Sequence, residues 1–430
     1  MNYADNPYLF RQDSSFLYYF GLDFPSIAAI IDIDEDKEVI FGDEPTIEDI
    51  IWLGPQRPLN EKAQQVGVTQ TAPVAELAAI LADAASRNRK IHFLPQFRAE
   101  NILKLEKLLS IPNAELAGNV SVPLIRAVAA QRSIKSDEEI AEIEVAMDIC
   151  YEMHTAAMKT ARPGMYERQV AGIIEGIALS MGGRISFPVI FSIHGETLHN
   201  HYHGNLMNAG DIAINDSGAE SAMNYAGDIT RTIPIGGKFS PRQKDIYNIV
   251  LKTQETTMQA VKPGVEFRDV HLLAGEVLAC GLKELGLMKG DPAEAARAGA
   301  HALFFQCGLG HMMGLDVHDM ENLGEEYVGY TDTIKRNPQF GFCSLRLGKA
   351  LEPGYVITVE PGLYFIPELI DRWKAENKFA QFINYDKVEE YKDFGGVRLE
   401  DDVLVTKDGF RLLGKPIPKS IEEVEALSSL

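Results

Sequence analysis

The sequence predicts an α/β protein with two domains, a small amino-terminal domain and a larger carboxy-terminal domain built from two similar halves. Three observations lead to this prediction. The chain has 430 residues, which is too long for a single compact core. Strand-like and helix-like runs alternate in the first part of the chain. A short motif then recurs in the second part, as ARPGMYERQV (161–170) and as VKPGVEFRDV (261–270).

The amino-terminal part has the pattern of a small α/β domain. The apolar runs SIAAIIDID (26–34) and KIHFLP (90–95) are typical of buried strands. Between them, TAPVAELAAILADAASRNRK (71–90) has apolar residues at helical spacing and a basic end, which predicts an amphipathic helix. The pattern breaks within SVPLIRAVAAQRSIKS (121–136). We therefore assign residues 1–126 to the first domain and residues 127–430 to the second.

The two copies of the motif occupy the same place in a longer repeated pattern. A long amphipathic helix precedes each copy and opens with a serine followed three residues later by Glu or Gln, namely Ser136 with Glu139 and Ser240 with Gln243. Another helical run and then glycine-rich, β-branched strands follow each copy. Pro-Gly alone is a common helix stop, so it is the shared order of elements that favours a duplication. Two similar α/β halves would pack their sheets together and leave a cleft, which is a usual place for a ligand site.

The composition excludes several classes of function. The formal net charge is −21, which makes nucleic acid and anionic membranes unfavourable partners. The amino terminus lacks a basic region followed by an apolar run, and no stretch approaches the roughly 20 apolar residues of a membrane span. A reduced, cytoplasmic setting is indicated by the four cysteines, which show no paired spacing: Cys150, Cys280, Cys307 and Cys343.

The first segment that could carry chemistry is GDIAINDSGAESAMNYAGDITRT (210–232). Asp216 shares a strand face with Ile212 and Ile214, and Asp228 begins the next strand-like run. The glycines and the asparagine between them favour a hairpin, which would bring the two aspartates together across neighbouring strands. An aspartate in an apolar strand is costly unless its charge is compensated. The segment alone leaves a second interpretation open, in which both acids are solvated near turns.

The second segment, CGLGHMMGLDVHD (307–319), carries two histidines. His311 lies between Gly310 and two methionines, and His318 follows in DVHD. A lone histidine in an apolar run is more often a satisfied core residue than a ligand. The spacing leaves the relative orientation of the two histidines open, because Gly314 could break a strand.

Two later segments combine strands with acidic residues. GYVITVEPGLYF (354–365) is apolar on both strand faces until it reaches Glu360 and Pro-Gly. In GGVRLEDDVLVT (395–406), the polar residues Arg398, Glu400 and Asp402 alternate with apolar residues. An isolated EDD is usually a solvated edge. Four acid-bearing strands and a histidine in the same half of the chain are less easily explained in that way.

Taken together, these segments supply one imidazole and four carboxylates, from Asp216, Asp228, His311, Glu360 and Glu400. Such a set, without a thiolate, prefers hard or borderline divalent ions such as Mn²⁺. Four carboxylates over-supply one ion, whereas two dications and a bridging hydroxide would leave a net charge of about −1. Two neighbouring metal ions can generate hydroxide near neutral pH and polarise a carbonyl group. The residues therefore predict a dinuclear metallohydrolase whose weakly negative centre suits a terminal ammonium.

The order and setting of these residues resemble a known superfamily. DSGAE…DITRT, GLGHMMGLDVHD, VEPGLY and VRLEDD are similar to the motifs of aminopeptidase P, prolidase and methionine aminopeptidase. RQDSSFLYYFGLDFP (11–25) resembles the amino-terminal domain of aminopeptidase P, so the resemblance covers nearly the whole chain. It implies an α/β (α+β) architecture, in which a small amino-terminal α/β domain precedes a pseudo-two-fold catalytic domain with the pita-bread fold.

The resemblance also implies a role for each residue of the predicted centre. Asp216 would bind one metal ion, and Asp228 and Glu400 would bridge two ions. His311 and Glu360 would complete the other ion's set, and Glu360 would also move protons to and from the bridging water. Mn²⁺ is the expected metal, with Zn²⁺ and Co²⁺ as alternatives.

Further residues of the pocket are implied by the same resemblance. His318 matches a substrate-orienting histidine, and His199, in GETLHNHYHGN (195–205), matches an upstream histidine that contacts substrate. His201 and His203 lie nearby, and this cluster could instead bind stray metal on a surface strand. The resemblance also implies that Arg398 helps to shape or gate the pocket. The expected catalytic residues are His199, His318, Glu360 and Arg398.

Two departures from the superfamily pattern concern the site. The two aspartates are twelve residues apart, one more than is usual, and we expect the extra residue in the hairpin turn, where insertion is tolerated. Cys307 stands where aminopeptidases P and prolidases commonly carry histidine. We expect Cys307 and Tyr364 to line the substrate pocket, with the thiol on the leaving-group side.

The predicted function is that of a metal-dependent exopeptidase, which releases the amino-terminal residue from peptides with proline in second position. A hydroxide bridging two metal ions would attack the scissile carbonyl, and an apolar slot would select the proline ring, whose nitrogen carries no N–H. Prolidase, restricted to Xaa-Pro dipeptides, is the near alternative. A non-catalytic peptide-binding protein is a remote alternative, because all five ligand positions are filled. We expect a cytoplasmic homodimer or higher homo-oligomer without nucleic-acid or membrane partners.

Overall fold

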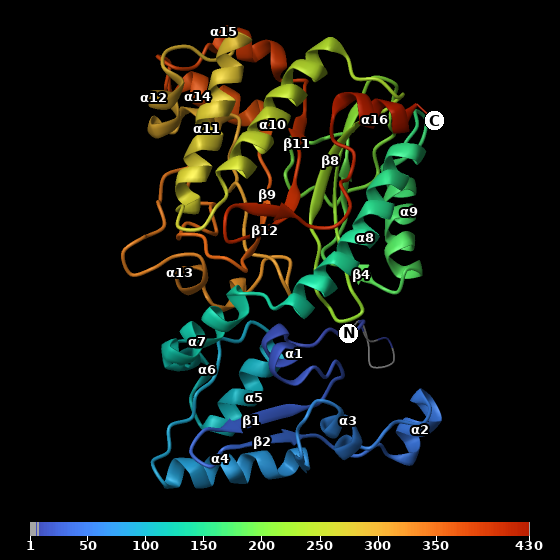
Figure 1. Cartoon of the computed structure of the whole chain (residues 1–430), viewed down its shortest axis with the longest axis vertical. Coiled ribbons are helices and arrows are strands. Elements are labelled where there is room, and N and C mark those ends of the chain that lie inside the picture. The colour runs from blue at the N-terminus through green and yellow to red at the C-terminus, as the bar shows by residue number, and fades with distance from the viewer. Residues whose placement is uncertain (1–5, 7, 430) are drawn as a thin grey trace. The chain divides into compact units, whose positions relative to one another are not determined.

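The computed structural model describes residue 6 and residues 8–429, and Figure 1 shows its course. The chain divides into two compact units, Met1–Val128 and Ala129–Leu430. The division falls within helix α7 (Val122–Ser133), which also contains the boundary predicted between residues 126 and 127. Helices and strands occur in both units, so the predicted α/β class is confirmed.

The amino-terminal unit has a three-stranded sheet in the order β1-β2-β3. Strands β1 (Ala28–Asp32) and β2 (Lys37–Phe41) are antiparallel, whereas β3 (Gln70–Ala72) runs parallel to β2. The helices of this unit are α1 (Ser14–Phe20), α2 (Ile47–Leu53), α3 (Leu59–Gln65), α4 (Leu77–Ser86), α5 (Ala99–Leu109) and α6 (Asn113–Leu116). The buried core is formed by Phe20, Leu22, Ile40, Leu59, Ala63 and Val68.

Two of the three elements predicted for this unit are found. The run 26–34 contains β1, and the run 71–90 contains α4. The run 90–95 is not a strand, which corrects the prediction, because its Phe93 carbonyl accepts a hydrogen bond from the Ser121 N–H at 3.2 Å outside any sheet ladder. Pro95 at the end of the run lacks the N–H that a ladder would need.

The second unit contains the two halves that the repeat predicts. The first half comprises α8 (Asp137–Thr160), α9 (Glu167–Ser180), β4 (Arg184–Ile185), β5 (Ile190–Ser192), β6 (Ile212–Ser217), β7 (Ala219–Glu220) and β8 (Ile229–Pro234). The second half begins with α10 (Pro241–Ala260), α11 (Phe267–Glu284), α12 (Pro292–Ala298) and α13 (Glu325–Val328). It continues with β9 (Val356–Val359), β10 (Gly362–Tyr364), α14 (Pro367–Ala375), α15 (Tyr385–Val388), β11 (Gly396–Arg398), β12 (Asp401–Val405), β13 (Phe410–Leu412) and α16 (Ile421–Ser428).

The long first helix of each half begins with the predicted cap. The Ser136 hydroxyl accepts a hydrogen bond from the Glu139 N–H at 3.3 Å, and Glu139 accepts one from the Ser136 N–H at 2.9 Å. Ser240 and Gln243 form the same reciprocal pair at 3.3 and 2.8 Å. These bonds satisfy N–H groups that the first turn of a helix leaves without a partner. Each cap therefore defines the start of its helix locally.

Equivalent main-chain hydrogen bonds follow the Pro-Gly motif in both halves. The N–H of Gly164 donates to the Met207 carbonyl at 2.8 Å, and that of Gly264 donates to the Leu351 carbonyl at 2.9 Å. Both glycines have positive φ angles, 87° and 81°, in the left-handed region that glycine enters without steric cost. The recurrence of the same contacts supports the predicted duplication and its pseudo-two-fold arrangement.

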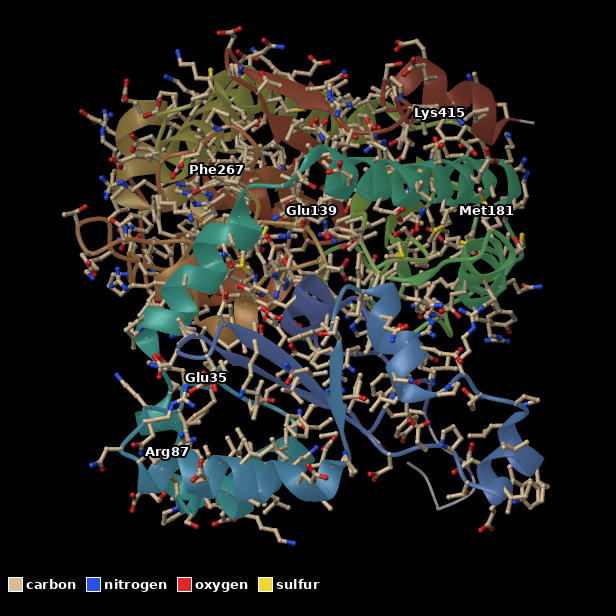
Figure 2. The ribbon with its side chains drawn as sticks, turned by 60° about the horizontal axis from the view of Figure 1, so that its bottom comes forward. Glu35, Arg87, Glu139, Met181, Phe267 and Lys415 are labelled. Carbon is tan, nitrogen blue, oxygen red and sulfur yellow. The ribbon has the colours of Figure 1, made fainter. Side chains whose placement is uncertain are left out.

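The sheets of the two halves meet beside the candidate site. Strands β5, β6 and β8 form one sheet, and strands β13, β12 and β9 form another. The N–H of Glu400, just before β12, donates to the Thr230 carbonyl of β8 at 3.0 Å, which joins the halves. Figure 1 shows β8 and β11 between helices α8 and α10. Side chains fill the spaces between these elements, and Phe267 at the start of α11 is fully buried (Figure 2).

Within the described part of the chain, none of the helices is both long and apolar enough to cross a bilayer.

Candidate metal centre

The two predicted aspartates lie on neighbouring antiparallel strands. Asp216 is in β6, where it stands opposite Thr230 of β8, and Asp228 directly precedes β8. Both aspartate side chains are buried. The hairpin predicted from the intervening glycines and asparagine is therefore confirmed, with the short strand β7 in its connection.

The second half contributes the other three predicted side chains. Two hydrogen bonds between His311 and Thr358, at 3.0 and 3.1 Å, attach the histidine segment to β9. Glu360 follows directly after β9, and Glu400 directly precedes β12. Because β9 and β12 are paired, both glutamates lie at one end of the same sheet.

Four of the predicted side chains form one cluster. Ligand atoms of Asp228, His311 and Glu400 all lie within 4.8 Å of one another. The Nε2 atom of His311 is 3.4 Å from Oδ2 of Asp228 and 3.7 Å from Oε1 of Glu360. Segments that are up to 172 residues apart in sequence (228 to 400) thus meet in one place.

Arg398 links the fifth predicted ligand, Asp216, to this cluster. Its Nη2 atom donates to Oδ2 of Asp216 at 2.5 Å, and its Nε atom donates to the Thr230 hydroxyl at 3.1 Å. The same hydroxyl donates to Oε2 of Glu400 at 2.6 Å. Arg398 also donates to the Tyr364 hydroxyl at 2.8 Å. The buried guanidinium therefore compensates part of the negative charge and orients Asp216.

The carboxyl groups of the centre repel one another. Burial, followed by the charge of Asp216, raises the pKa of Asp228 well above its usual range. Burial raises the pKa of Glu360 to about 7. Burial and then the charge of Asp228 raise the pKa of Glu400 well above its usual range. The negative charge of the clustered carboxylates is therefore only partly compensated, and divalent cations would compensate the rest.

The donor atoms of these residues fit such cations. The Oδ1 atoms of Asp216 and Asp228 are buried and have no hydrogen-bond partner. Nδ1 of His311 is 3.0 Å from the Met312 carbonyl, which can only accept, so Nδ1 carries the proton and Nε2 keeps a free lone pair. Carboxylate oxygens with a single imidazole suit borderline ions such as Mn²⁺ or Zn²⁺. The residues present thus fit a divalent metal site.

Asp402 is a further buried acid that supports the centre. Its Oδ2 atom accepts the Asp228 N–H at 2.9 Å, and its Oδ1 atom has no hydrogen-bond partner. Burial and the charge of Asp228 raise the pKa of Asp402 well above its usual range. Asp402 is not among the residues predicted for the centre. Its alternation with Glu400 is the signal in the sequence that could have identified it, since alternate strand residues share a face.

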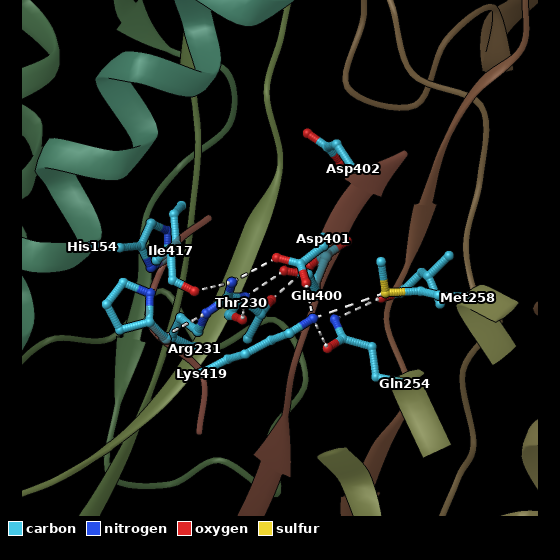
Figure 3. A network of polar contacts seen from close by, with 12 residues as sticks. His154, Thr230, Arg231, Gln254, Met258, Glu400, Asp401, Asp402, Ile417 and Lys419 are labelled. Carbon is cyan, nitrogen blue, oxygen red and sulfur yellow. Dashed lines mark hydrogen bonds and ion pairs between the residues drawn. The ribbon is translucent and has the colours of Figure 1, made fainter. Parts of the chain in front are cut away.

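A network of buried charges holds these strands from the other face (Figure 3). Arg231 donates to the Glu400 carbonyl at 2.7 Å and to Oδ1 of Asp401 at 2.6 Å. Lys419 donates to Oδ2 of Asp401 at 2.7 Å and to Oε1 of Gln254 at 3.1 Å. Because Asp401 is flanked by Glu400 and Asp402, it points away from the centre and holds the strand instead.

Both predicted substrate-contacting histidines lie near the centre. The rings of His318 and His311 have centroids 4.4 Å apart, so the two side chains lie next to each other. The spacing of the two histidines in the sequence does not determine this. Burial and then the neighbouring His311 lower the pKa of His318 to about 2. His199 is more exposed, and its partial desolvation, followed by the charge of Arg398, lowers its pKa. Nδ1 of His318 lies 2.9 Å from Oε2 of Glu321.

Cys307 and Tyr364 lie on the same wall of the site. The Cys307 sulfur is 3.9 Å from the Tyr364 hydroxyl. Burial, followed by the charge of Glu360, raises the pKa of the Cys307 thiol to about 12, so the thiol stays protonated near neutral pH. This environment favours a packing or weak polar role for the sulfur over a nucleophilic one.

Two hollows lie along Glu321 and Glu325, and His318 lines the smaller one. The smaller is lined by His311, Met312, His318, Asp319, Glu321, Glu325, Val328 and Arg346. The larger has a volume of about 490 Å³ and is lined by Glu321, Gly324, Glu325, Glu326, Tyr330, Thr331, Lys335 and Arg336. Because Glu321 and Glu325 border both hollows, the space next to His318 extends along these two glutamates.

Comparison with known families agrees with this architecture. Residues 141–407 match metallopeptidase family M24, and residues 1–92 match the aminopeptidase P amino-terminal domain. An Xaa-Pro dipeptidase from Homo sapiens is 32% identical, over 98% of this chain and 85% of the relative. A probable Xaa-Pro aminopeptidase from Paracoccidioides brasiliensis is 34% identical, over 99% of this chain and 89% of the relative.

Solved structures show the same fold. Zinc-substituted aminopeptidase P from Escherichia coli, in complex with product, has a TM-score of 0.79 and 30% identity, and the match covers 100% of this chain and 91% of that one. Proline aminopeptidase P II from Yersinia pestis has a TM-score of 0.80 and 29% identity, with 100% and 92% covered. The predicted two-domain fold is thus confirmed. The chain belongs to metallopeptidase family M24 and carries the aminopeptidase P type of amino-terminal domain.

Proposed function

We propose that the chain is a metal-dependent Xaa-Pro aminopeptidase, which hydrolyses the bond between the first residue of a peptide and a proline in second position. The observation that carries this proposal is the convergence of Asp228, His311 and Glu400 within 4.8 Å, in a chain whose relatives over nearly its whole length are named Xaa-Pro peptidases. In this proposal residues 1–126 form the aminopeptidase P-like domain and residues 127–430 the catalytic domain.

The proposed cofactor is a pair of divalent ions per chain, with Mn²⁺ as the best activator and Zn²⁺ or Co²⁺ as alternatives. Asp216 would bind one ion, and Asp228 and Glu400 would bind both. His311 and Glu360 would complete the set of the other ion. The unpartnered Oδ1 atoms of Asp216 and Asp228 support this assignment. When bound, the ions would supply a nucleophile near neutral pH and polarise the scissile carbonyl.

Glu360 is the residue proposed to move the proton. Its side chain is 19% exposed, compared with 7% for Asp228 and 11% for Asp216, so it borders the open side of the cluster. In the reaction, water adds to the carbonyl carbon and Glu360 takes a proton from it. The C–N bond then breaks as the proline nitrogen receives that proton. The products are a free amino acid and a peptide that begins with proline.

Charge and shape explain the proposed selectivity. The four carboxyl groups around a single guanidinium would attract the ammonium group of a free peptide amino terminus. His199 and His318 would orient the substrate beside this ammonium, and Arg398 would hold Asp216 in place. A proline nitrogen carries no N–H in the peptide bond, so the site needs no acceptor at that position.

A dipeptidase is the second candidate, and the position of Arg346 favours it. Arg346 lines the same hollow as His311 and His318, where a guanidinium could bind the free carboxylate of an Xaa-Pro dipeptide. Arg346, however, already pairs with Glu321 and, at 2.9 Å, with Glu325. Two carboxylates compensate its charge, so the aminopeptidase remains the leading proposal.

The proposal includes a cytoplasmic homodimer or higher homo-oligomer. All four cysteines are free thiols, which supports a reducing compartment. In helix α2, four apolar side chains are between 71% and 78% exposed, namely Ile47, Ile51, Trp52 and Leu53. Large apolar side chains exposed together on one short helix favour contact with a partner, which supports self-association. The molecular mass in solution, measured by sedimentation, tests this point, and a monomer at all concentrations would contradict it.

A peptide-length series with metal analysis tests the proposed function. Protein reconstituted with Mn²⁺ is expected to release the first residue from Xaa-Pro tripeptides and from longer Xaa-Pro peptides. Blocking the amino terminus is expected to prevent cleavage. Chelation is expected to abolish activity, and Asp228→Ala to remove both activity and bound metal. Cleavage of dipeptides alone would make the protein a dipeptidase, and full activity after exhaustive chelation would contradict the metal-dependent reaction.

A further inference from the structure

One buried carboxylate, that of Glu167, holds both ends of the loop that carries His199. Glu167 is the first residue of α9, and its side chain has no exposed surface. Oε1 accepts the Ser192 hydroxyl at 3.0 Å and the Ile193 N–H at 2.8 Å. Oε2 accepts the N–H and the side-chain amide of Asn205 at 3.3 and 2.9 Å. The loop between residues 193 and 205 thus begins and ends on the same side chain.

Ser192 transmits this anchor into the middle of the loop. Its hydroxyl oxygen accepts the His194 N–H at 3.0 Å and the Asn200 side-chain amide at 3.0 Å, while it donates to Glu167. Asn200 is the residue next to His199 in sequence. Two hydrogen bonds in series, through the Ser192 hydroxyl, therefore connect Glu167 to Asn200, the residue adjacent to the histidine.

The second half of the unit shows that the helix start itself does not require a carboxylate. The motif copies 161–170 and 261–270 place Phe267 at the position equivalent to Glu167. The N–H groups of both residues make the equivalent main-chain bond, to Asn205 and to Lys349, each at 3.1 Å. Phe267 is fully buried there, as expected for a core position. A buried carboxyl group at this position is costly unless polar donors surround it, so its presence points to the loop that it holds.

The loop lies close against the strand that leads to Arg398. A Cβ atom added at Gly195 would stand 2.9 Å from the Gly396 carbonyl oxygen of β11, so the two main chains touch. The charge of Arg398 contributes to the lowered pKa of His199, after desolvation. A shift of the loop would therefore move His199 relative to Arg398 and to the substrate position beside it.

We propose that Glu167 is a positioning residue, which fixes the loop 193–205 so that His199 meets the peptide substrate. The inference rests on the proposed function, because it takes His199 to contact the substrate. The hydrogen bonds of the Glu167 carboxylate go to Ser192, Ile193 and Asn205, none of which is a proposed metal ligand. The effect of Glu167 should therefore appear in substrate binding and depend on His199.

Glu167→Gln tests this inference. Glutamine replaces one acceptor oxygen with an amide that can only donate, and in either orientation a main-chain N–H, of Ile193 or Asn205, faces that amide. The variant is expected to raise KM for an Xaa-Pro tripeptide about fivefold and to change kcat little, the mark of a lost binding contact. Bound metal should stay at the wild-type level. Amide exchange at Ile193 and Asn205 should become faster than in the wild type.

A double-mutant cycle with His199→Ala separates positioning from a general loss of structure. If Glu167 acts through His199, Glu167→Gln raises KM in the wild-type background and has no further effect in His199→Ala. Glu425→Gln is the matched control, because Glu425 is also buried and accepts a main-chain N–H, that of Phe239 at 3.1 Å, away from the site. It should leave KM unchanged.

Each other outcome overturns the inference. An equal rise in KM in both backgrounds would make Glu167 a purely structural residue, and no rise at all would remove any role in binding. If Glu167→Gln fails to fold, Ser192→Ala takes its place, because it cuts the same chain of bonds to Asn200. Wild-type protein that does not cleave Xaa-Pro peptides would refute the proposed function instead. Cleavage by the wild type is therefore measured before the variants are compared.

Discussion

The main-chain N–H of Asp228 donates a hydrogen bond to Oδ2 of Asp402 at 2.9 Å, so a buried carboxylate holds the main chain of a predicted metal ligand. Asp402→Asn keeps an acceptor for this N–H but removes a negative charge from the centre. We expect metal affinity to fall roughly tenfold to a hundredfold, as is typical when a residue that orients a ligand is changed. Titration of the chelated protein with Mn²⁺ measures this. Removal of the charge should also reduce repulsion, so the metal-free variant should unfold at a higher denaturant concentration than the metal-free wild type.

Asp408→Asn is the matched control for this prediction. Asp408 is an exposed acid in the turn after β12, so the same charge is removed from the same hairpin without touching the centre. It should bind metal like the wild type. Equal metal affinity in Asp402→Asn and Asp408→Asn would show that Asp402 does not support the metal site.

Arg231 is expected to be irreplaceable by lysine. Its guanidinium donates to the main-chain carbonyls of Thr230 and Glu400 at 2.9 and 2.7 Å, and to Asp401 at 2.6 Å. A lysine ammonium cannot reach all of these acceptors from one position. Arg231→Lys should therefore lower the free energy of unfolding by about 3 kcal/mol, the scale for disrupting a buried ion pair. Denaturant unfolding of the metal-loaded protein measures this loss.

Lys419→Met provides the comparison for Arg231→Lys. Lys419 also pairs with Asp401, at 2.7 Å, but its side chain is 23% exposed, so water can replace part of that contact. Its loss should cost less stability than Arg231→Lys. A larger loss in Lys419→Met would contradict the view that the guanidinium is the main link between the strands.

Features that depend on neighbouring residues could be predicted from the sequence. The caps of α8 and α10 follow from serines with Glu or Gln three residues later, and both reciprocal pairs are present. The hairpin that aligns Asp216 with β8 follows from the glycines between them. The repeated motif likewise predicts equivalent helices in the two halves. In each case a few adjacent residues determine the geometry.

Features that depend on distant contacts could not be predicted from the sequence pattern alone. The bond from Asp228 to Asp402 joins strands of different halves, and no local pattern gives their register. The role of Glu167 likewise appears only once both ends of its loop are in place. The predicted strand at 90–95 fails for the opposite reason, because a run of apolar residues is compatible with burial outside any sheet. Register between segments far apart in the chain is the missing information in the first two cases.

Two buried histidines outside the centre should make stability depend on pH. Burial lowers the pKa of His271 to about 4 and, with His271 adding to it, lowers that of His301 to about 3. Both therefore stay neutral in the folded protein at about pH 5, whereas they gain a proton in the unfolded chain below about pH 6.5. The unfolded state binds more protons in this window, so stability is full above about pH 6.5 and falls as the pH drops. The loss is about 2 kcal/mol per histidine at about pH 5.

His301→Leu isolates this effect from the acids of the centre. Both ring nitrogens of His301 are buried without a hydrogen-bond partner, so leucine removes two unpartnered polar atoms from the core. The variant should be at least as stable as the wild type near neutral pH, and its loss of stability on acidification should be smaller by about 2 kcal/mol. Denaturant unfolding of both proteins at about pH 5 and about pH 7 provides the measurement. An identical pH dependence in the two proteins would contradict the prediction.

Cys307 is expected to affect the binding of longer peptides without affecting the metals. Its sulfur lies 3.9 Å from the Tyr364 hydroxyl, and a thiol is a weak donor that behaves more like a small apolar group. Cys307→His would restore a polar donor on this wall, worth roughly 1 kcal/mol or about fivefold in affinity. It should lower KM for Xaa-Pro tripeptides and longer peptides more than it changes kcat, with bound metal unchanged.

Because the pKa of the thiol is raised to about 12, thiol reagents should modify the wild type only slowly near neutral pH. Cys307→Ala serves as the control for size. If both variants match the wild type across peptides of several lengths, the sulfur contributes packing alone.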